Sequence, residues 1–243
     1  MTLIKSISGI RGTIGGKPGD GLTPFDVVKF TSAYGAWIIS RNKDKKCKII
    51  LGRDARISGT MVSGLVSSTL LGLGIDVIDT GLSTTPTVEM EVPFHQAQGG
   101  IILTASHNPK QWNALKLLNE KGEFISAADG AEVLDIAERE AFQYAEVGQL
   151  GTLTTDHHSI ARHIEKILAL PMVDRKAIAS KNFKVVIDCV NSTGGIAVPA
   201  LLRALGVKDI IELYCTPDGH FPHNPEPLPE HLTEISKEVV KSK

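Results

Sequence analysis

The residues of this chain whose types and spacing could do chemistry follow one apolar segment. Residues 99–104 predict a buried strand, which runs into the motif Thr-Ala-Ser-His-Asn-Pro at 104–109. Ser106 therefore stands just beyond a strand end. Lys116 follows ten residues later, and Arg11 lies in a glycine-rich segment near the N-terminus. Two cations beside a serine would offset the charge of about −1.5 to −2 on a phosphoryl group, so the pattern allows Ser106 to carry one.

The same motif has two other interpretations. A Ser/His hydrolase would need His107 to take the proton of Ser106, but adjacent residues of an extended segment point to opposite faces. The G-x-S-x-G turn of many such enzymes is also missing. The four residue types of Ser-His-Asn-Pro equally suit a hydrogen-bonded turn without chemistry. Taken alone, the tetrapeptide favours the plain turn, so the interpretation depends on the rest of the chain.

Strands alternate with helices along the first half of the chain. In order, the apolar and capped segments predict a helix from Thr23-Pro24 through Trp37, a strand at 48–52, a helix at 61–73, a strand at 75–79, a helix from Pro86 and the strand at 99–104. This alternation is typical of βαβ units. We therefore expect an α/β fold with a mixed, mostly parallel sheet sandwiched between helices, and ligands beyond the carboxyl ends of its strands.

A second, similar α/β block follows a boundary expected at 148–155, after an acidic helix at 131–144. Its predicted elements are a helix at 160–170, a strand at 184–190, a helix at 196–205, a strand at 210–214, a proline-rich loop at 217–229 and a helix at 230–241. The predicted domains are thus 1–150, with the Ser106 loop, and 155–243. Two strands are few for a free-standing sheet, so we expect the second domain to be incomplete.

The composition indicates a neutral globular chain. Its 243 residues include 26 Lys+Arg and 27 Asp+Glu, and 42% are hydrophobic. This balance gives no electrostatic footprint for nucleic acid or an anionic membrane, and no segment approaches the roughly 20 apolar residues of a membrane span. Cys47, Cys189 and Cys215 are far apart and indicate reduced thiols, and Met1–Arg11 does not resemble a signal peptide. We expect a cytoplasmic protein.

Three further segments carry polar groups with less specific patterns. Arg53, Asp54 and Arg56 predict an ion-pair network that fixes a loop near the site. Residues 191–195 could cradle a phosphate, but without G-x-G-x-x-G spacing they favour a tight strand-to-helix turn.

The third segment holds Asp156 next to His157 and His158, a combination that invites a metal-site interpretation. We expect a solvated linker there instead.

Four motifs occur in order along the chain. They are Ser8-Gly9-Ile10-Arg11-Gly12, Gly52-Arg53-Asp54-Ala55-Arg56-Ile57-Ser58-Gly59, Thr104-Ala105-Ser106-His107-Asn108-Pro109 and Asn113-Ala114-Leu115-Lys116. Together they closely resemble the motifs of the α-D-phosphohexomutase superfamily. Residues 218–222 and 224–227 look like a second-domain loop of that family. The resemblance runs from about Ile4 to the C-terminus.

The resemblance implies a role for each residue of the candidate site. Ser106 would carry a phosphoryl group, donate it to one hydroxyl of a hexose phosphate to give a 1,6-bisphosphate, and recover phosphate from the other end. Arg11 and Lys116 would line the phosphoserine site, with Lys116 a candidate for proton transfer. His107 and Asn108 would touch phosphate or substrate.

One position departs from the family pattern. Ala114 stands where the family commonly has glycine, but Lys116 keeps its spacing from the serine loop, so its implied role is retained.

The resemblance also implies cofactors. The family holds Mg²⁺ between the phosphate on its serine, here Ser106, and three aspartates of a D-x-D-x-D loop, and a sugar 1,6-bisphosphate acts as activator. No such aspartate run is present, so the aspartate ligands are expected beyond residue 243. We therefore expect the N-terminal half of a phosphohexomutase of carbohydrate metabolism, an isomerase by intramolecular phosphoryl transfer, and expect this part to be inactive alone.

Alternatives remain open for both the substrate and the class of function. A phosphomannomutase/phosphoglucomutase is favoured over a phosphoglucosamine mutase, and the sequence does not choose among mannose, glucose and glucosamine phosphates. A different class remains open as well, a sugar-phosphate binding module that uses the Ser106 loop as an anion site without covalent chemistry. The oligomeric state is not indicated.

Overall fold

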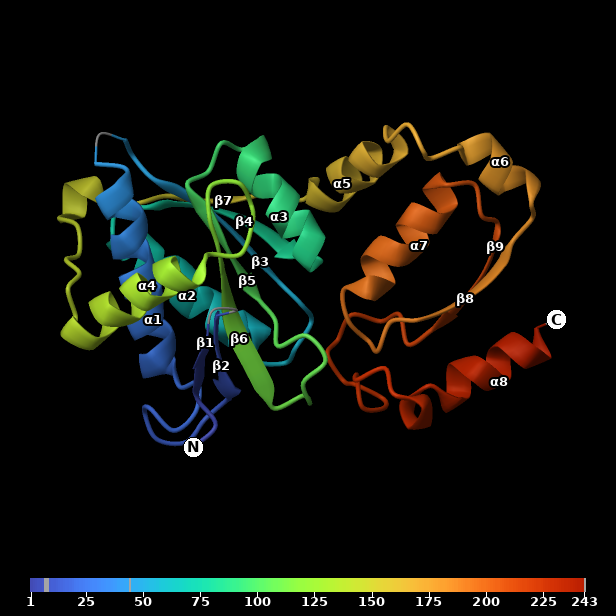
Figure 1. The fold of residues 1–243 in the computed structure, drawn as a ribbon, viewed down its shortest axis with the longest axis horizontal. Helices are drawn as coiled ribbons and strands as arrows, with labels where there is room; N and C mark the ends of the chain where they lie inside the picture. The colour runs from blue at the N-terminus through green and yellow to red at the C-terminus, as the bar shows by residue number, and fades with distance from the viewer. Residues whose placement is uncertain (7–8, 44, 243) are drawn as a thin grey trace.

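The apolar segments of the first 155 residues form one seven-stranded sheet in the computed structural model, which describes residues 1–6, 9–43 and 45–242 (Figure 1). Ser8 of the first motif lies outside the described residues. The strands are β1 (Ile4–Ser6), β2 (Gly9–Thr13), β3 (Lys48–Arg53), β4 (Asp76–Leu82), β5 (Gly99–Leu103), β6 (Trp112–Leu118) and β7 (Leu153–Thr155). They lie in the order β1-β2-β6-β5-β3-β4-β7. All strands except β1 and β6 share one direction, so the expected mixed sheet is confirmed.

Helices cover both faces of this sheet. One core joins Ile49 and Leu51 of β3 to α1 (Pro24–Arg41), α2 (Gly59–Gly72) and α4 (Ala127–Arg139). The other joins Ile50 to α3 (Thr85–Phe94). Neighbouring residues of β3 thus enter opposite cores, because side chains alternate across a strand. None of the described helices is both long and apolar enough to cross a membrane.

Three features of the first 155 residues differ from the sequence prediction. The sequence does not predict β1, β2 or β6, which pair antiparallel and therefore lack the βα rhythm. It also does not predict β7, which has only three residues, all exposed. The acidic helix occupies Ala127–Arg139 rather than 131–144. Ser126 caps its start by accepting a hydrogen bond from the Asp129 amide, and Glu140 follows its end in a left-handed conformation (φ 50°).

A second α/β unit follows β7. It contains α5 (Ser159–Leu168), α6 (Arg175–Ser180), β8 (Lys184–Asp188), α7 (Gly194–Ala204), β9 (Asp209–Leu213) and α8 (Thr233–Lys241), and short 3₁₀ turns lie at Val147–Gln149 and Pro229–His231. Among the residues described, β8 and β9 form a parallel two-stranded sheet. β7 pairs with β4, so the first sheet reaches Thr155, within the expected boundary region.

The His223 side chain connects the proline-rich loop at 217–229 to the end of β8. His223 Nε2 lies 2.8 Å from Asp188 Oδ2, and its Nδ1 lies 2.9 Å from the Asn224 carbonyl oxygen. Both neighbours only accept hydrogen bonds, so both ring nitrogens carry hydrogen and the ring is an imidazolium. Burial disfavours this charge, but the two acceptors outweigh burial and raise the pKa of His223.

We expect His223→Asn to lower the free energy of unfolding at acidic pH and to matter less at alkaline pH. A raised pKa means that the folded state binds the proton more tightly. The stabilisation is therefore complete below the ordinary value of 6.5 and is lost as pH rises through the folded value. Urea titrations at about pH 5.5 and about pH 9 measure the difference. His220→Asn, at a side chain that is 74% exposed, is the control, and an equal loss at both pH values would contradict the imidazolium assignment.

Candidate active site

Antiparallel pairing of β2 with β6 places two cations on one face of the sheet. Arg11 lies opposite Ala114, and Lys116 follows two residues along the same strand, so all three share a face. Gly9 lies on this face with a φ of 115°, and a Cβ there would overlap the Leu115 carbonyl oxygen. The glycine thus allows the two strands to approach closely beside the cations.

The cations and the serine loop line one cavity of about 100 Å³. Its walls are Gly9, Arg11, Thr104, Ala105, Ser106, His107, Asn108, Ala114 and Lys116. The structure therefore brings together all five residues predicted to form the site, from β2, from β6 and from the loop after β5. Ala114, the departure from the family pattern, is part of the wall and does not separate Lys116 from the serine loop.

Ser106 occupies an unfavourable backbone conformation at the mouth of this cavity. Its φ of 55° lies in the left-handed region, which costs free energy for a residue other than glycine. Its amide donates to Thr104 Oγ1 over 3.0 Å, and that hydroxyl donates to Asp54 Oδ2 over 2.6 Å. The side chain of Ser106 itself is exposed. The loop is thus held so that the hydroxyl faces solvent.

One buried guanidinium holds the rest of the serine loop. Arg56 is 1% exposed, and its Nε donates to Asp54 Oδ2 over 3.1 Å. Its other four N–H groups donate over 2.7–2.9 Å to the backbone carbonyl oxygens of Ser106, Asn108, Pro109 and Trp112. The predicted ion pair is confirmed for Asp54 and Arg56. Arg53 instead donates to the backbone oxygen of Asp54 over 3.2 Å.

The two cavity cations have no hydrogen-bonded counter-ion among the described residues. Burial lowers the pKa of Lys116, the carboxylates of Glu89 and Asp54 oppose this effect, and the charge of Arg11 lowers the pKa further. The Nε of Arg11 is buried and has no hydrogen-bond partner among the described residues. A buried donor without a partner beside a second cation suits an anionic ligand. The lowered pKa also brings Lys116 closer to giving up a proton.

The other two predicted residues, His107 and Asn108, directly follow Ser106 in the chain. His107 Nδ1 lies 3.5 Å from Ser106 Oγ, so the expectation that they point to opposite faces is wrong, because the left-handed Ser106 is not extended. That distance is long for a hydrogen bond, and within the described chain nothing binds the second ring nitrogen of His107. A hydrolase triad is therefore not assembled. Asn108 Nδ2 donates to the Ala105 carbonyl oxygen over 2.7 Å and braces the loop.

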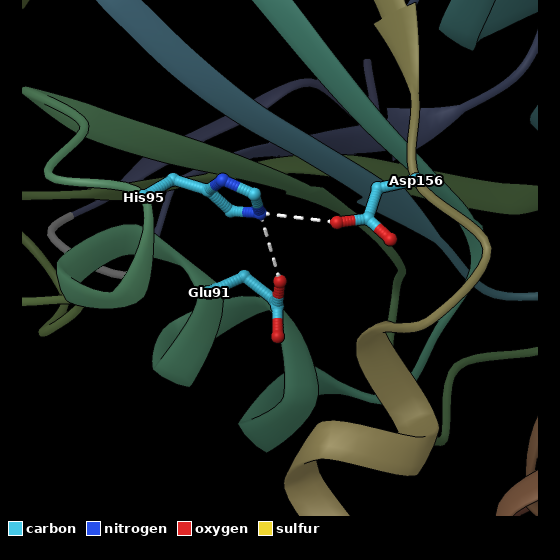
Figure 2. A group of neighbouring side chains, drawn as sticks. All are labelled: Glu91, His95 and Asp156. Atoms are coloured by element: carbon cyan, nitrogen blue, oxygen red, sulfur yellow. Dashed lines mark hydrogen bonds and ion pairs between the residues drawn. The ribbon is translucent and has the colours of Figure 1, made fainter.

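A second cluster of titratable side chains lies between α3 and the segment that leads into α5 (Figure 2). His95 Nε2 lies 3.1 Å from Glu91 Oε2 and 3.1 Å from Asp156 Oδ2. These three ligand atoms could hold a metal ion. The sequence predicts Asp156 in a solvated linker. This is wrong for Asp156, which is only 14% exposed, whereas His157 and His158 are exposed.

Arg162 already occupies the cation position of this cluster. Its Nη2 contacts the same two oxygens, Glu91 Oε2 and Asp156 Oδ2. The backbone oxygen of His95 accepts a hydrogen bond from Lys48 Nζ. None of Glu91, His95, Asp156 and Arg162 lines the cavity of Ser106, so the cluster is separate from that cavity. No local motif signals the whole cluster, because Glu91 and His95 lie at the end of α3 whereas Asp156 and Arg162 come from the segment after β7.

Comparison with known proteins places this geometry in a family. The sequence matches two sequence models, "Phosphoglucomutase/phosphomannomutase, alpha/beta/alpha domain I" over residues 3–144 and the corresponding domain II over residues 161–243. The chain belongs to the phosphoglucomutase/phosphomannomutase family, which confirms the resemblance seen in its motifs.

The relatives are sugar-phosphate mutases by name. The chain is 36% identical over 234 residues to a phosphoglucomutase/phosphomannomutase of Thermococcus kodakarensis, which covers 95% of this chain and 50% of the relative. It is 34% identical over 236 residues to a phosphoglucosamine/phosphogalactosamine mutase of Sulfurisphaera tokodaii, with 96% and 49% covered. A solved phosphoglucomutase/phosphomannomutase family protein of Burkholderia thailandensis shares the fold (TM-score 0.79, 23% identity, 98% of this chain and 50% of that one). The chain thus spans about half the length of these relatives.

Replacing Arg56 tests its hold on the serine loop. We expect Arg56→Met to cost about 3–5 kcal/mol of unfolding free energy, because it leaves the Asp54 charge unpaired and four carbonyl oxygens without donors. Arg56→Lys should not restore this loss, since an ammonium cannot reproduce the planar fork. Urea denaturation measures both variants, with Arg53→Met as the matched control. An Arg56→Met protein as stable as the control would show that other donors serve the loop.

Removing Arg162 should convert the second cluster into a metal site. Histidine and carboxylate ligands suit Zn²⁺, and without the guanidinium the two oxygens are free to bind it. We expect Arg162→Ala to bind one more equivalent of Zn²⁺ than the wild-type chain in isothermal titration. Arg162→Ala/His95→Ala is the control that subtracts binding to cysteines and other histidines. Equal zinc uptake by the wild-type chain and Arg162→Ala would contradict occupation of the site by Arg162.

Proposed function

We propose that this chain is the serine-carrying part of a cytoplasmic phosphohexomutase, which interconverts hexose 1-phosphate and hexose 6-phosphate through a phosphoserine at Ser106. The observation that carries the proposal is the cavity that Ser106 lines together with two cations, Arg11 and Lys116, neither of which has an ion-pair partner among the described residues. A phosphoryl group on Ser106 would supply the missing charge and an acceptor for the buried Arg11 Nε.

The chemistry follows from these positions. A hydroxyl oxygen of the hexose phosphate attacks the phosphorus on Ser106, the Oγ–P bond breaks, and the hydroxyl proton ends on Ser106 Oγ. Lys116 has a lowered pKa and would relay that proton, while Arg11 would bind the transferring oxygens. The resulting 1,6-bisphosphate reorients, and Ser106 Oγ attacks the phosphorus at the other end. The sugar O–P bond breaks there, and the Ser106 hydroxyl proton ends on the released sugar oxygen. His107 and Asn108 would contact phosphate or sugar.

The cavity residues alone do not fit Mg²⁺. This ion prefers a shell of oxygen ligands, and Asp54, the carboxylate nearest the loop, already accepts hydrogen bonds on both oxygens. The cluster around His95 contains an arginine and shares no residue with the cavity of Ser106. A phosphate oxygen on Ser106 would be one ligand for Mg²⁺, which would stabilise charge on the transferring group, but the cavity residues supply no carboxylate to complete its shell. This chain alone should then be inactive as a mutase.

The substrate is a hexose phosphate in this proposal. The names of the relatives favour glucose and mannose phosphates in one case and glucosamine or galactosamine phosphates in the other. Glucose or mannose phosphate is our first choice because the relative of Thermococcus kodakarensis has the higher identity, and a sugar 1,6-bisphosphate is the expected activator.

The test is the mass of the protein purified from its native cells and of its Ser106 peptide. We expect an addition of about 80 Da on Ser106. In the native-length protein, Ser106→Ala should abolish phosphoryl transfer, whereas Ser68→Ala, at an exposed serine on α2, should not. An unphosphorylated native protein whose Ser106→Ala variant still binds inorganic phosphate would instead establish an anion-binding module.

A further inference from the structure

The proline-rich loop of the second unit reaches the arginine that holds the serine loop. In Figure 1 the segment after β9 lies beside the loop that joins β5 to β6. The Phe221 ring centroid lies 5.2 Å from the guanidinium carbon of Arg56. These two residues come from different units and lie far apart in the sequence, so only the tertiary structure brings them together.

The guanidinium has only its faces left for a contact of this kind. All five of its N–H groups are already donated within its plane, to Asp54 and to the four loop carbonyl oxygens. An aromatic ring suits the remaining face, because its π-electrons attract the cation and its carbon atoms exclude water. Phe221 is itself half-buried, so the contact is partly shielded from solvent. A shielded cation binds its acceptors more strongly than a hydrated one.

The backbone next to Arg56 also contacts the second unit. The Ala55 amide lies 3.4 Å from Ser192 Oγ, which accepts its hydrogen bond. Gly219 has a φ of 76°, and a Cβ there would overlap the Ala55 carbonyl oxygen. Only glycine allows the loop to lie this close to Ala55. The second unit therefore contacts the Arg56 segment through backbone and through a ring.

Phe221 is held between two anchored neighbours. The carbonyl oxygen of His220 accepts from Asn191 Nδ2 over 2.9 Å, and the His223 imidazolium bonds Asp188 at the end of β8. The ring cannot follow Arg56 freely, because its flanks are tied to β8 and to the turn before α7. A shift of the second unit would therefore move the ring relative to the guanidinium.

We propose that Phe221 is a positioning residue for Ser106, acting through Arg56, so that the serine loop keeps its conformation only while the second unit is seated against it. That this positioning matters for phosphoryl transfer by Ser106 rests on the proposed function. The structural part of the inference, that the ring stiffens residues 104–112, stands on the contacts alone. Phe221 is not one of the residues that line the cavity of Ser106, Arg11 and Lys116.

Hydrogen–deuterium exchange on the 243-residue chain tests the proposal. We expect Phe221→Leu, which keeps apolar volume but loses the π face, to raise exchange of residues 104–112 about fivefold to tenfold. Exchange of α4, in the first unit but away from Phe221, should not change. Phe221→Tyr, which keeps the ring face, should restore wild-type exchange. Phe183→Leu, at an exposed phenylalanine elsewhere in the second unit, is the matched control.

Four results would overturn the proposal. The first two are unchanged exchange of residues 104–112 in Phe221→Leu and the same increase in Phe183→Leu. The third is an increase spread equally over α4, which would make Phe221 a general stability residue. The fourth is an increase in Phe221→Tyr equal to that in Phe221→Leu. The exchange result does not depend on phosphate at Ser106, whereas the mass of the Ser106 peptide does, so failure of this inference and failure of the proposed function are separable.

Discussion

The guanidinium of Arg56 organises the candidate site. Burying a cation is costly unless its charge and all its donors are satisfied. Here Asp54 supplies the counter-charge, and four carbonyl oxygens of one loop take the remaining donors. The loop has no regular secondary structure between Leu103 and Trp112 to fix it. Its conformation, including the left-handed Ser106, therefore depends on a side chain from the neighbouring strand end.

The degree of compensation separates structural from functional cations in this chain. Arg56 has an acceptor for every N–H group, and Arg162 is shared by two carboxylates. Both belong to the framework for this reason. Arg11 and Lys116 instead line one cavity together. The Nε of Arg11 has no hydrogen-bond partner among the described residues, and burial lowers the pKa of Lys116. An arrangement that costs stability in the empty site is the kind expected where a ligand supplies the missing charge.

The second unit is joined to the first at two separate places. Toward one edge of the sheet, Arg162 of α5 contacts Glu91 of α3, and His163 Nδ1 lies 2.9 Å from Thr87 Oγ1. Near the carboxyl edge, the proline-rich loop meets the Arg56 segment. Two joints on different parts of the sheet restrict rotation of one unit against the other better than either would alone. With this arrangement, the contact of Phe221 with Arg56 can affect the conformation of Ser106 in the first unit.

The sequence alone predicted the order of the main βα elements, the family and five of the nine residues that line the cavity, because apolar periodicity, caps and motif spacing are local properties of a chain. The tertiary structure alone decided the antiparallel strands β1, β2 and β6, the left-handed turn that brings His107 beside Ser106, and the place of Asp156. It also decided that Arg56 bonds four carbonyl oxygens and that Arg162 fills a cluster of metal-ligand type. Those features depend on which distant groups compensate a buried charge or complete a sheet edge, and no local pattern encodes that choice.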